Sequence, residues 1–307
     1  ITMIKKITIA SRESPLAIWQ AEFIKSKINL LFPDIKINIE GFKTQGDILI
    51  NQPLSLIGGK GLFIKELEKA LIEKKADLAV HSMKDLPMDI PEEFQLVAIT
   101  KREDPRDAFI SNNFNSMDAM PKDSVIGTSS LRRQSQIKAK YPDLIIEPLR
   151  GNLQTRLNKL DGGHYDAIIL AAAGLIRLDL KPRIRAYLDT GMSIPAVGQG
   201  ALGIEVLNGN KELNEILKSL NDDDTSRCVL AERAVSRSLA GSCTVPLGAF
   251  ATISSNDFII KGFVASPDGS RIVHGEISGN KLDYYRLGEA LSQILIDKGA
   301  KDILSSL

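Results

Sequence analysis

The sequence predicts an α/β protein whose last third changes to an α+β pattern. Strand-like and helix-like segments alternate over the first two hundred residues, which is typical of parallel sheets covered by helices. From about residue 223, alternating strands follow instead, two of them joined by a Ser-Pro-Asp-Gly-Ser turn, as in a small antiparallel sheet. A chain of 307 residues is too long for one small core, so two or three domains are expected.

The first block of elements follows from apolar periodicity and helix-start signals. Ser14 stands at a helix N-cap, with Pro15 at the first helical position. The pattern predicts strands at 5–10, 35–42 and 77–80, and helices at 14–32 and 61–75. Residues 43–61 are rich in Gly, Lys, Gln, Asn and Pro, and a connection of this length is typical of a lid or a disordered segment.

Two further blocks complete the chain. In the second, strands are expected at 124–126, 144–147 and 166–170, with helices at 129–140 and 152–160. In the third, a helix at 225–239 precedes strands at 248–252, 258–265 and 271–278 and a final helix at 282–298.

Composition argues against several classes of protein. The 39 Lys and Arg against 38 Asp and Glu leave a net charge of +1, so no overall field attracts nucleic acid or anionic lipid. Apolar runs fall short of the roughly 20 residues of a membrane span, and residues 1–11 lack the apolar region of a signal peptide; Met3 is the expected natural start. With two cysteines and three histidines, neither a disulfide framework nor an ordinary zinc site is expected. We therefore predict a cytoplasmic protein without a metal.

Basic residues concentrate between Ser124 and Arg185. This segment holds 11 Lys and Arg against 5 Asp and Glu, a net charge of +6. Ligands of open α/β sheets bind beyond the carboxyl ends of the strands, and a planar guanidinium suits bidentate binding of carboxylate or phosphate. Four arginines are expected at such positions: Arg132, Arg133, Arg150 and Arg156. The alternative interpretation is a solvated basic face.

Hydroxyl side chains accompany these arginines. Thr128, Ser129 and Ser130 open the helix that carries the first two of them, where backbone N–H groups and the helix dipole favour an anion. Plain helix capping is the alternative, and it explains one hydroxyl better than three. Arg12 and Ser14 repeat the arrangement where the first strand ends and the first helix begins.

A second candidate site follows the strand at 77–80. In His81-Ser82-Met83-Lys84-Asp85, the adjacent Lys84 and Asp85 suit acid–base chemistry or stabilisation of charge. A structural ion pair is the alternative interpretation. His81 is expected to be a satisfied core residue and not a ligand.

Two glycine-rich motifs give weak signals, and the two cysteines have different interpretations. Gly58-Gly59-Lys60-Gly61 lacks the spacing and the Ser/Thr of a phosphate-binding P-loop, and Gly198-Gln199-Gly200 is equally well explained as a turn. Cys243 lies in a Gly-flanked loop, where a thiol can act as a nucleophile or an attachment point, although no His lies nearby in the sequence. Cys228, inside an amphipathic helix, is expected to be a packing residue.

Together, six motifs resemble the porphobilinogen deaminase family, also called hydroxymethylbilane synthases. In chain order they are Arg12-x-Ser14-x-Leu16-Ala17-x-x-Gln20, HSMKDLP (81–87), GTSSLRRQ (127–134), LRGNLQTRL (149–157), AVGQGALGIE (196–205) and LAGSCTVPLGA (239–249). No single motif is specific, but the set in this order is. The segment between Phe42 and Leu62 matches only at its ends.

The resemblance implies a three-domain fold. Two α/β domains would be built like type II periplasmic binding proteins, with crossovers near residues 100 and 200. The third would be a smaller α+β domain with a three-stranded antiparallel sheet. The implied boundaries are 1–100 with about 201–222, then 101–200, then 223–307.

The resemblance also implies a transferase of tetrapyrrole and haem biosynthesis. A dipyrromethane cofactor, assembled from the substrate, would be held by a thioether to the Cys of the LAGSC motif, here Cys243. Four porphobilinogen molecules would be added in turn with loss of ammonia, and linear hydroxymethylbilane would be released by hydrolysis. The family favours a cytoplasmic monomer that uses no metal or nucleotide and has no nucleic-acid or membrane partner.

Residue roles carry over motif by motif. Asp85 would be the catalytic carboxylate, which binds the pyrrole N–H and stabilises the cation left when ammonia departs. A soft thiolate at Cys243 would capture the same electrophile. The resemblance assigns the cofactor, together with Asp85, to Ser82, Lys84, Thr128, Ser129, Ser130, Arg132 and Arg133. It assigns the substrate or growing chain to Arg12, Ser14, Arg150, Arg156, Arg177 and Gln199, with Lys60 and Asp47 in the lid.

Two rival functions compete with this one. A binding module of two α/β lobes closing on an anionic small molecule explains the arginines equally well, but it has no use for a thiol on a third domain. A DNA-responsive regulator would need a helix-turn-helix and a basic reading surface, and the sequence shows neither.

Overall fold

The structure is a computed structural model that describes residues 3–49, 61–239 and 245–307. The chain divides into two compact units, Ile1–Arg102 with Ala201–Ser226 and Glu103–Gly200 with Arg227–Leu307. The division of the second unit into two domains near residue 223 stays a prediction. Lys60 and Cys243, both assigned roles from the sequence, lie outside the described residues.

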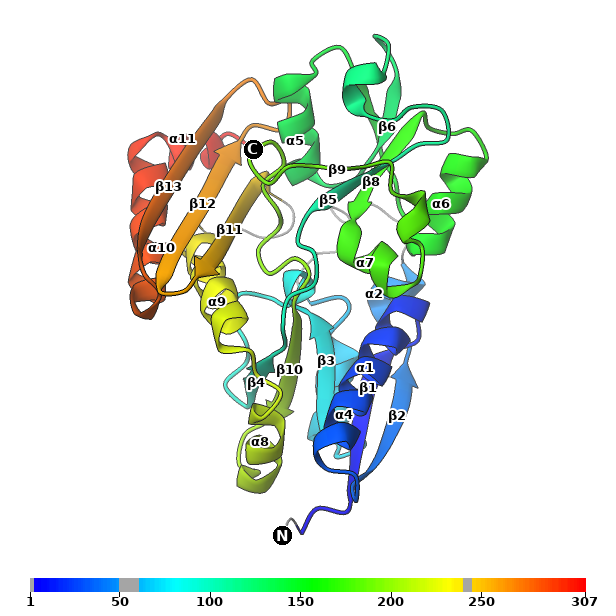
Figure 1. Cartoon of the computed structure of the whole chain (residues 1–307), viewed down its shortest axis with the longest axis vertical. Coiled ribbons are helices and arrows are strands. Elements are labelled where there is room, and N and C mark those ends of the chain that lie inside the picture. The colour runs from blue at the N-terminus through cyan, green and yellow to red at the C-terminus, as the bar shows by residue number, and fades with distance from the viewer. Residues whose placement is uncertain (1–2, 50–60, 240–244) are drawn as a thin grey trace. The chain divides into compact units, whose positions relative to one another are not determined.

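The first unit is built on a five-stranded mixed sheet with the order β2-β1-β3-β10-β4. Its strands are β1 (Lys6–Arg12), β2 (Lys36–Phe42), β3 (Leu78–Ser82), β4 (Phe94–Ile99) and β10 (Leu202–Leu207). β1 runs parallel to β2 and β3, whereas β10 lies antiparallel between β3 and β4 (Figure 1). The helices of this unit include α1 (Pro15–Leu31), α2 (Gln45–Ile48), α4 (Lys65–Ile72) and α8 (Lys211–Lys218).

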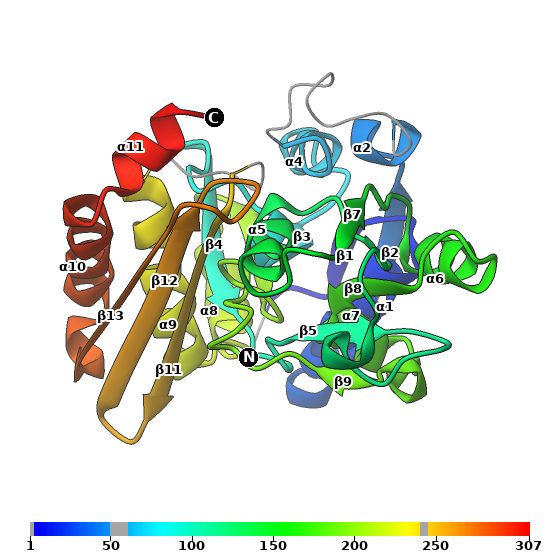
Figure 2. The same ribbon diagram turned by 90° about the horizontal axis from the view of Figure 1, so that it is seen from above.

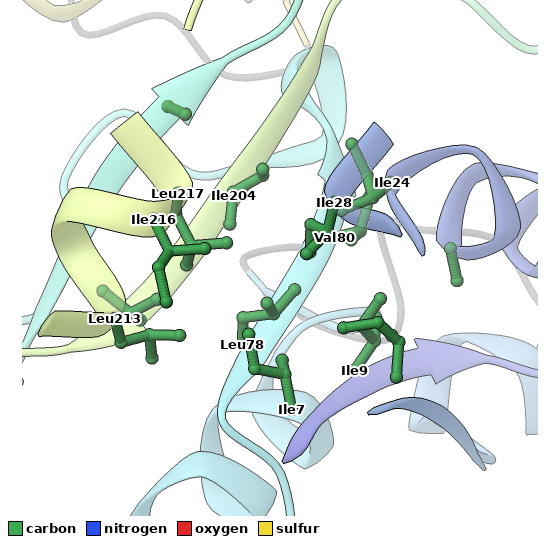
Figure 3. Packing of buried hydrophobic residues seen from close by; sticks show 14 of the residues in the cluster. Ile7, Ile9, Ile24, Ile28, Leu78, Val80, Ile204, Leu213, Ile216 and Leu217 are labelled. Atoms are coloured by element: carbon green, nitrogen blue, oxygen red, sulfur yellow. The ribbon is translucent and has the colours of Figure 1, made fainter. Parts of the chain in front are cut away.

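Apolar side chains cover both faces of this sheet. On one face, Ile24 and Ile28 of α1 and Leu217 of α8 pack against strand residues such as Ile9 and Ile204 (Figure 3). On the other face, α4 buries its apolar stripe against small residues of β1 and β3, in a cluster that contains Leu67, Leu71, Ala10 and Ala79. Each fully buried Ile or Leu contributes roughly 1.5–3 kcal/mol to folding, so these two layers fix the sheet and the strand ends.

The second unit contains a five-stranded sheet with the corresponding order, β7-β6-β8-β5-β9. Its strands are β5 (Asp107–Ile110), β6 (Val125–Gly127), β7 (Ile145–Glu147), β8 (Ala167–Ala171) and β9 (Ala186–Tyr187). β6 is parallel to β7 and β8, and β5 is antiparallel to β8 and β9. Its helices include α5 (Leu131–Lys140), α6 (Leu153–Asp161) and α7 (Ala172–Arg177). Both five-stranded sheets therefore place an antiparallel strand fourth.

A three-stranded antiparallel sheet completes the second unit. It consists of β11 (Leu247–Ser254), β12 (Asp257–Ala265) and β13 (Ile272–Asn280), with α10 (Tyr284–Asp297) lying along it (Figure 2). Glycines permit this close packing, because a Cβ on Gly275 would lie 3.0 Å from Leu291 of α10. A Cβ on Gly288 of α10 would lie 2.6 Å from the Ala231 carbonyl oxygen of α9 (Asp223–Ser238), so this helix pair also needs glycine. α11 (Ala300–Ser305) ends the chain.

The predicted fold class is confirmed, with a correction to the sheets. The strand orders agree with two α/β parts like type II periplasmic binding proteins, followed by an α+β part with three antiparallel strands. The expectation of parallel sheets is wrong, because β5 and β10 are antiparallel to their neighbours. An apolar run reads the same in either direction, so periodicity cannot report strand direction. The helix expected at 61–75 is shorter, because Gly61 adopts a φ of 74° in a turn before α4.

Candidate active site

In the first unit, candidate site residues gather at one edge of the sheet. Arg12 is the last residue of β1 and Ser82 the last of β3, and these strands run parallel. The carboxyl ends of parallel strands meet at the same edge, where ligands of such sheets bind. Ser14 follows there as the N-cap of α1, accepting from the Ala17 N–H at 3.4 Å, as predicted for its capping role.

The segment after β3 holds Asp85 on a short, anchored turn. Met83–Asp85 form a single 3₁₀ turn in which Met83 is fully buried, as is Leu86 just beyond it. The Met83 N–H donates to the Ala201 carbonyl oxygen at 2.9 Å, and the Gln20 amide donates to the Ser82 hydroxyl at 2.9 Å. Asp85 itself is exposed. The turn therefore presents a carboxylate to solvent from a backbone fixed on both sides.

Arg12 is oriented by groups of its own unit. Its guanidinium donates to both carboxylate oxygens of Asp47, from Nε at 3.3 Å and from Nη2, and stacks 4.1 Å from the Phe63 ring centre. Thr44 and Asp47 form a capping box at the start of α2. Partial burial alone would raise the pKa of Asp47, but hydrogen bonds from Arg12 and Thr44 lower it below its usual value. Asp47 therefore stays ionised and holds Arg12 in place.

The core face beneath this edge holds an ionisable pair. His81 is 5% exposed, and its Nε2 lies 3.0 Å from Oε1 of the fully buried Glu205. The expectation that His81 is a satisfied core residue is confirmed. Glu205 is not among the candidate residues predicted from the sequence.

In the second unit, the predicted hydroxyls lie beyond the end of β6 and use their oxygens within the protein. Ser130 caps α5 by accepting from the Arg133 N–H at 3.2 Å, and Thr128 accepts from the Ser130 N–H at 3.1 Å. Ser129 bridges to Leu149, donating to its carbonyl oxygen at 3.0 Å and accepting from its N–H at 2.9 Å. Capping thus explains one hydroxyl, and the other two shape the loops at the sheet edge.

Both arginines of α5 converge on one buried carboxylate, Asp107. Arg132 donates bidentately to it, at 2.7 Å to Oδ2 and 3.1 Å to Oδ1, and Arg133 Nε donates to Oδ1 at 3.0 Å. Ser193 Oγ and Gln199 Nε2 donate to the same carboxylate at 2.6 and 3.0 Å. Asp107 is fully buried, and Arg132 and Arg133 are 5% and 6% exposed. These five side chains are called the Asp107 cluster below.

The Asp107 cluster carries a surplus of positive charge. Burial alone would raise the pKa of Asp107, but the adjacent Arg132 and Arg133 hold it far below its usual value, so the carboxylate is ionised. One carboxylate faces two guanidinium groups. Among the described residues, no second carboxylate hydrogen-bonds to either arginine. A buried excess charge of this kind is costly unless an anion completes it.

Three more of the arginines predicted from the sequence follow strands of the sheet in the second unit. Arg177, the last residue of α7, donates to the Gly200 carbonyl oxygen at 2.8 Å, and burial lowers its pKa to about 10. Arg156 donates from Nε to the Gly151 carbonyl oxygen at 2.8 Å. Within the described ranges, the Arg150 guanidinium makes no hydrogen bond or ion pair. The cations beyond the strand ends thus include one available to an anionic ligand.

Asp107, to which the other four side chains of the cluster donate, is not among the residues predicted from the sequence. Asp107 is the first residue of β5, next to Ala108, Phe109 and Ile110, and all four are buried. A carboxylate at the start of an apolar run is a signal that a partner cation lies in the core. Gln199, predicted to bind substrate, lies in the Asp107 cluster, between Gly198 and Gly200 in left-handed backbone with φ of 75° and 87°.

The described part of the chain contains neither a cluster of metal ligands nor a membrane-spanning helix. No group of three or more His, Cys, Asp or Glu side chains there could hold a metal ion. No helix among the same residues is long and apolar enough to cross a bilayer.

Comparison with protein families gives two matches along the chain. Residues 7–215 match the family described as porphobilinogen deaminase, dipyromethane cofactor binding domain. Residues 226–297 match the porphobilinogen deaminase C-terminal domain.

Curated relatives match over nearly the whole chain. Porphobilinogen deaminases from Laribacter hongkongensis and Nitrosomonas europaea are 52% and 55% identical over 303 residues, covering 99% of this chain and 98% of each relative. Among solved structures, the methionine-binding protein MetQ matches at 12% identity and a TM-score of 0.45, covering 72% of this chain and 92% of its own. Lipoprotein Tp32 from Treponema pallidum matches at 13% identity and a TM-score of 0.45, covering 70% and 90%.

Proposed function

The chain belongs to the porphobilinogen deaminase family, and we propose that it is the transferase that joins four porphobilinogen molecules head to tail. Each addition would release ammonia, the chain would grow on a dipyrromethane primer, and hydrolysis would release linear hydroxymethylbilane. The family model that covers residues 7–215 is named for the dipyrromethane cofactor. A monomer of three domains acting in the cytoplasm belongs to the same proposal.

The donor set fits a cofactor of this kind. Each pyrrole of a dipyrromethane bears an acetate and a propionate, so several protein groups are needed to bind the cofactor's carboxylates. The Asp107 cluster supplies two buried guanidinium groups against one protein carboxylate, and this surplus is the observation that carries the proposal. We assign the cofactor to Ser82, Lys84, Thr128, Ser129, Ser130, Arg132, Arg133 and, covalently, Cys243. When bound, the dipyrromethane supplies the pyrrole carbon to which the first substrate is joined.

Asp85 is the proposed catalytic carboxylate. Its turn is anchored by Met83 and Leu86 while its own side chain is exposed, so a substrate can reach it without displacing the core. A carboxylate held there accepts a hydrogen bond from the substrate pyrrole N–H. It also stabilises the positive charge that develops on the substrate ring as ammonia leaves, and it can move protons at the reacting centre.

The remaining cations would hold the substrate's acetate and propionate. Arg12 is pre-oriented by Asp47 and Phe63, so less side-chain entropy is lost when it binds a carboxylate. Arg150 has its donors available among the described residues. Ser14, Arg156, Arg177, Gln199 and Lys60 are assigned to the same role. Gln199 acts from within the Asp107 cluster and therefore couples substrate binding to the cofactor arginines.

Turnover by the Asp85→Asn variant tests this assignment. Wild-type protein incubated with porphobilinogen should form the linear tetrapyrrole, whereas Asp85→Asn should be slower by at least about 100-fold, because the amide cannot stabilise the developing cation. Its unfolding midpoint should be unchanged, since Asp85 is exposed. Asp89→Asn, an exposed carboxylate four residues on, is the matched control and should keep its activity. A folded Asp85→Asn variant with near-normal turnover would refute the role of Asp85.

A further inference from the structure

Three titratable side chains meet on the core face beneath the turn that carries Asp85. They are His81 of β3, Glu205 of β10 and Glu68 of α4. His81 Nε2 lies 3.0 Å from Glu205 Oε1, and Glu205 is fully buried. Glu68 lies on α4, which contacts β10, and Glu205 is close enough to influence the pKa of its carboxyl group. The mechanism proposed above uses none of the three.

Sheet register explains why the three groups meet. In the antiparallel pair of β3 and β10, Gly203 lies opposite His81 and Glu205 opposite Ala79. Side chains two residues apart on a strand point to the same face, so His81 and Glu205 are diagonal neighbours on one face. That face also carries Ala79, which packs against Leu67 of α4. The helix therefore brings its half-buried Glu68 over the pair.

The Glu68 carboxyl group binds its proton more tightly than an ordinary glutamate. Burial, and then the charge and hydrogen bond of Glu205, raise the pKa of Glu68 to about 7. The exposed Glu93 adds to this rise, and Lys65 of the same helix opposes it. β1 also packs against α4, and it contributes the uncharged Ala10 to the apolar cluster there. The guanidinium of Arg12, at the end of β1, forms an ion pair with Asp47.

An otherwise unpaired oxygen supports the shared proton. Glu205 Oε2 is buried, and no N–H or hydroxyl of the described residues donates to it. A buried acceptor without a donor costs roughly 1–3 kcal/mol. A protonated Glu68 is the donor that satisfies this oxygen. Glu205 Oε1 then accepts a hydrogen bond from His81 Nε2.

We propose that one proton shared by Glu68 and Glu205 fixes His81, and that this proton thereby positions the turn that carries Asp85. His81 precedes Ser82, whose hydroxyl accepts from Gln20, and Met83 packs over Gly203, the residue opposite His81. A shift of His81 therefore moves the anchored start of the turn. The three side chains act as positioning residues, and the inference rests on the proposed role of Asp85.

The direction of the pH dependence follows from the raised pKa. The Glu68 carboxyl has an ordinary pKa of 4.5 and binds its proton more tightly in the folded protein. Its favourable contribution is therefore fully present below about pH 4.5 and is lost as the pH rises through about 7. Above that pH, two adjacent carboxylates repel each other and loosen the contact between α4 and β10.

Unfolding by urea at pH 5.5 and 8.5 tests the shared proton without any substrate. Glu68→Gln keeps a donor toward Glu205 but cannot titrate. Between these two pH values, the unfolding constant of the wild type should rise about tenfold relative to Glu68→Gln. Glu73→Gln, an exposed carboxylate at the end of the same helix, should track the wild type. If the ratio of the unfolding constants of the wild type and Glu68→Gln stays the same at both pH values, the proposal is overturned.

The neighbouring charges give this test a direction. Glu93→Gln removes a charge that raises the pKa of Glu68, so the transition should move to lower pH. Lys65→Gln removes a charge that lowers this pKa, so the transition should move to higher pH. Shifts in one common direction, or none, would contradict the assignment to Glu68.

Amide exchange and turnover test the positioning of the turn. At pH 8.5, backbone amides of residues 82–86 should be protected severalfold less in the wild type than in Glu68→Gln, and at pH 5.5 equally. From pH 5.5 to pH 8.5, the kcat of Glu68→Gln divided by the kcat of the wild type should rise severalfold, and KM should not change. Equal protection at both pH values would overturn the positioning role. Absence of turnover in every variant would instead refute the proposed function, since the exchange result needs no substrate.

Discussion

Asp107 and Glu205 lie on corresponding strands of the two five-stranded sheets but have opposite surroundings. Each is a fully buried carboxylate on the antiparallel fourth strand, β5 in one unit and β10 in the other. Asp107 accepts from two guanidinium groups, and these lower its pKa against the effect of burial. Glu205 instead faces an imidazole and a second carboxyl, and the pKa of that neighbour, Glu68, rises to about 7.

The difference shows that the sheet determines where a buried carboxyl group lies, whereas the neighbouring side chains determine its protonation state. The Asp107 cluster keeps a surplus positive charge at every ordinary pH, which suits a site for a carboxylate-rich group. In the first unit, the Glu68 carboxyl beside Glu205 gains or loses its proton near neutrality. We therefore expect ligand anchoring in the second unit to be insensitive to pH, and the setting of the Asp85 turn in the first unit to respond to it.

Asp107→Asn should have the largest effect on folding. The change leaves two buried guanidinium groups without their carboxylate, and breaking such a pair costs about 3–5 kcal/mol. Urea unfolding at pH 7 measures this loss. Asp104→Asn breaks the more exposed pair with Arg106 and should cost at most about 1 kcal/mol. Equal costs at the two positions would show that the buried arginines do not depend on Asp107.

Glu205→Gln, the equivalent change in the other sheet, should be far milder. The amide oxygen still accepts from His81 and the amide nitrogen can donate to Glu68, so the expected cost at pH 6 is about 1 kcal/mol. The pKa of Glu68 should also fall toward its ordinary value, because the neighbouring charge is gone. A loss as large as that of Asp107→Asn would remove the contrast between the two carboxylates.

The smallest expected effect is the change with pH in the cost of Asp107→Asn. The depressed pKa of Asp107 means that its stabilisation is present above the usual pKa of 3.8 and is lost only as the pH falls through the much lower folded value. The cost should therefore be the same at pH 5.5 and 8.5, where that of Glu68→Gln changes. Urea unfolding at both values provides the comparison. A cost that varies across this range would place a titrating group in the Asp107 cluster.

Much of the framework was predictable because its signals are local. Ser14 and Pro15 mark the start of α1, and Ser130 caps α5, because caps depend on residues within one turn. Apolar periodicity predicted strands at the positions of β1, β2, β3, β6, β7 and β8 and of the three strands of the last part, but it did not give strand direction in the five-stranded sheets. Arginines at strand ends pointed to the edge of the sheet where the structure places them.

The rest depended on partners far apart in the sequence. Asp107 meets Arg132 across 25 positions, and His81 meets Glu205 across 124. No local pattern gives the direction of β5 or β10, and these strands bring the carboxylates to their partners. One signal was present: Asp107 begins an apolar run and Glu205 interrupts one, and a charge in a buried strand indicates a hidden partner.

The proposed function requires that the chain carries a dipyrromethane on Cys243 and extends it with porphobilinogen. Intact mass of the denatured protein, followed by peptide mapping, tests this most directly. We expect an excess mass equal to two linked pyrroles on the Cys243 peptide, present on purification or acquired after incubation with porphobilinogen, and absent from Cys243→Ala. An unmodified mass even after incubation would contradict it and favour a binding module for anionic ligands.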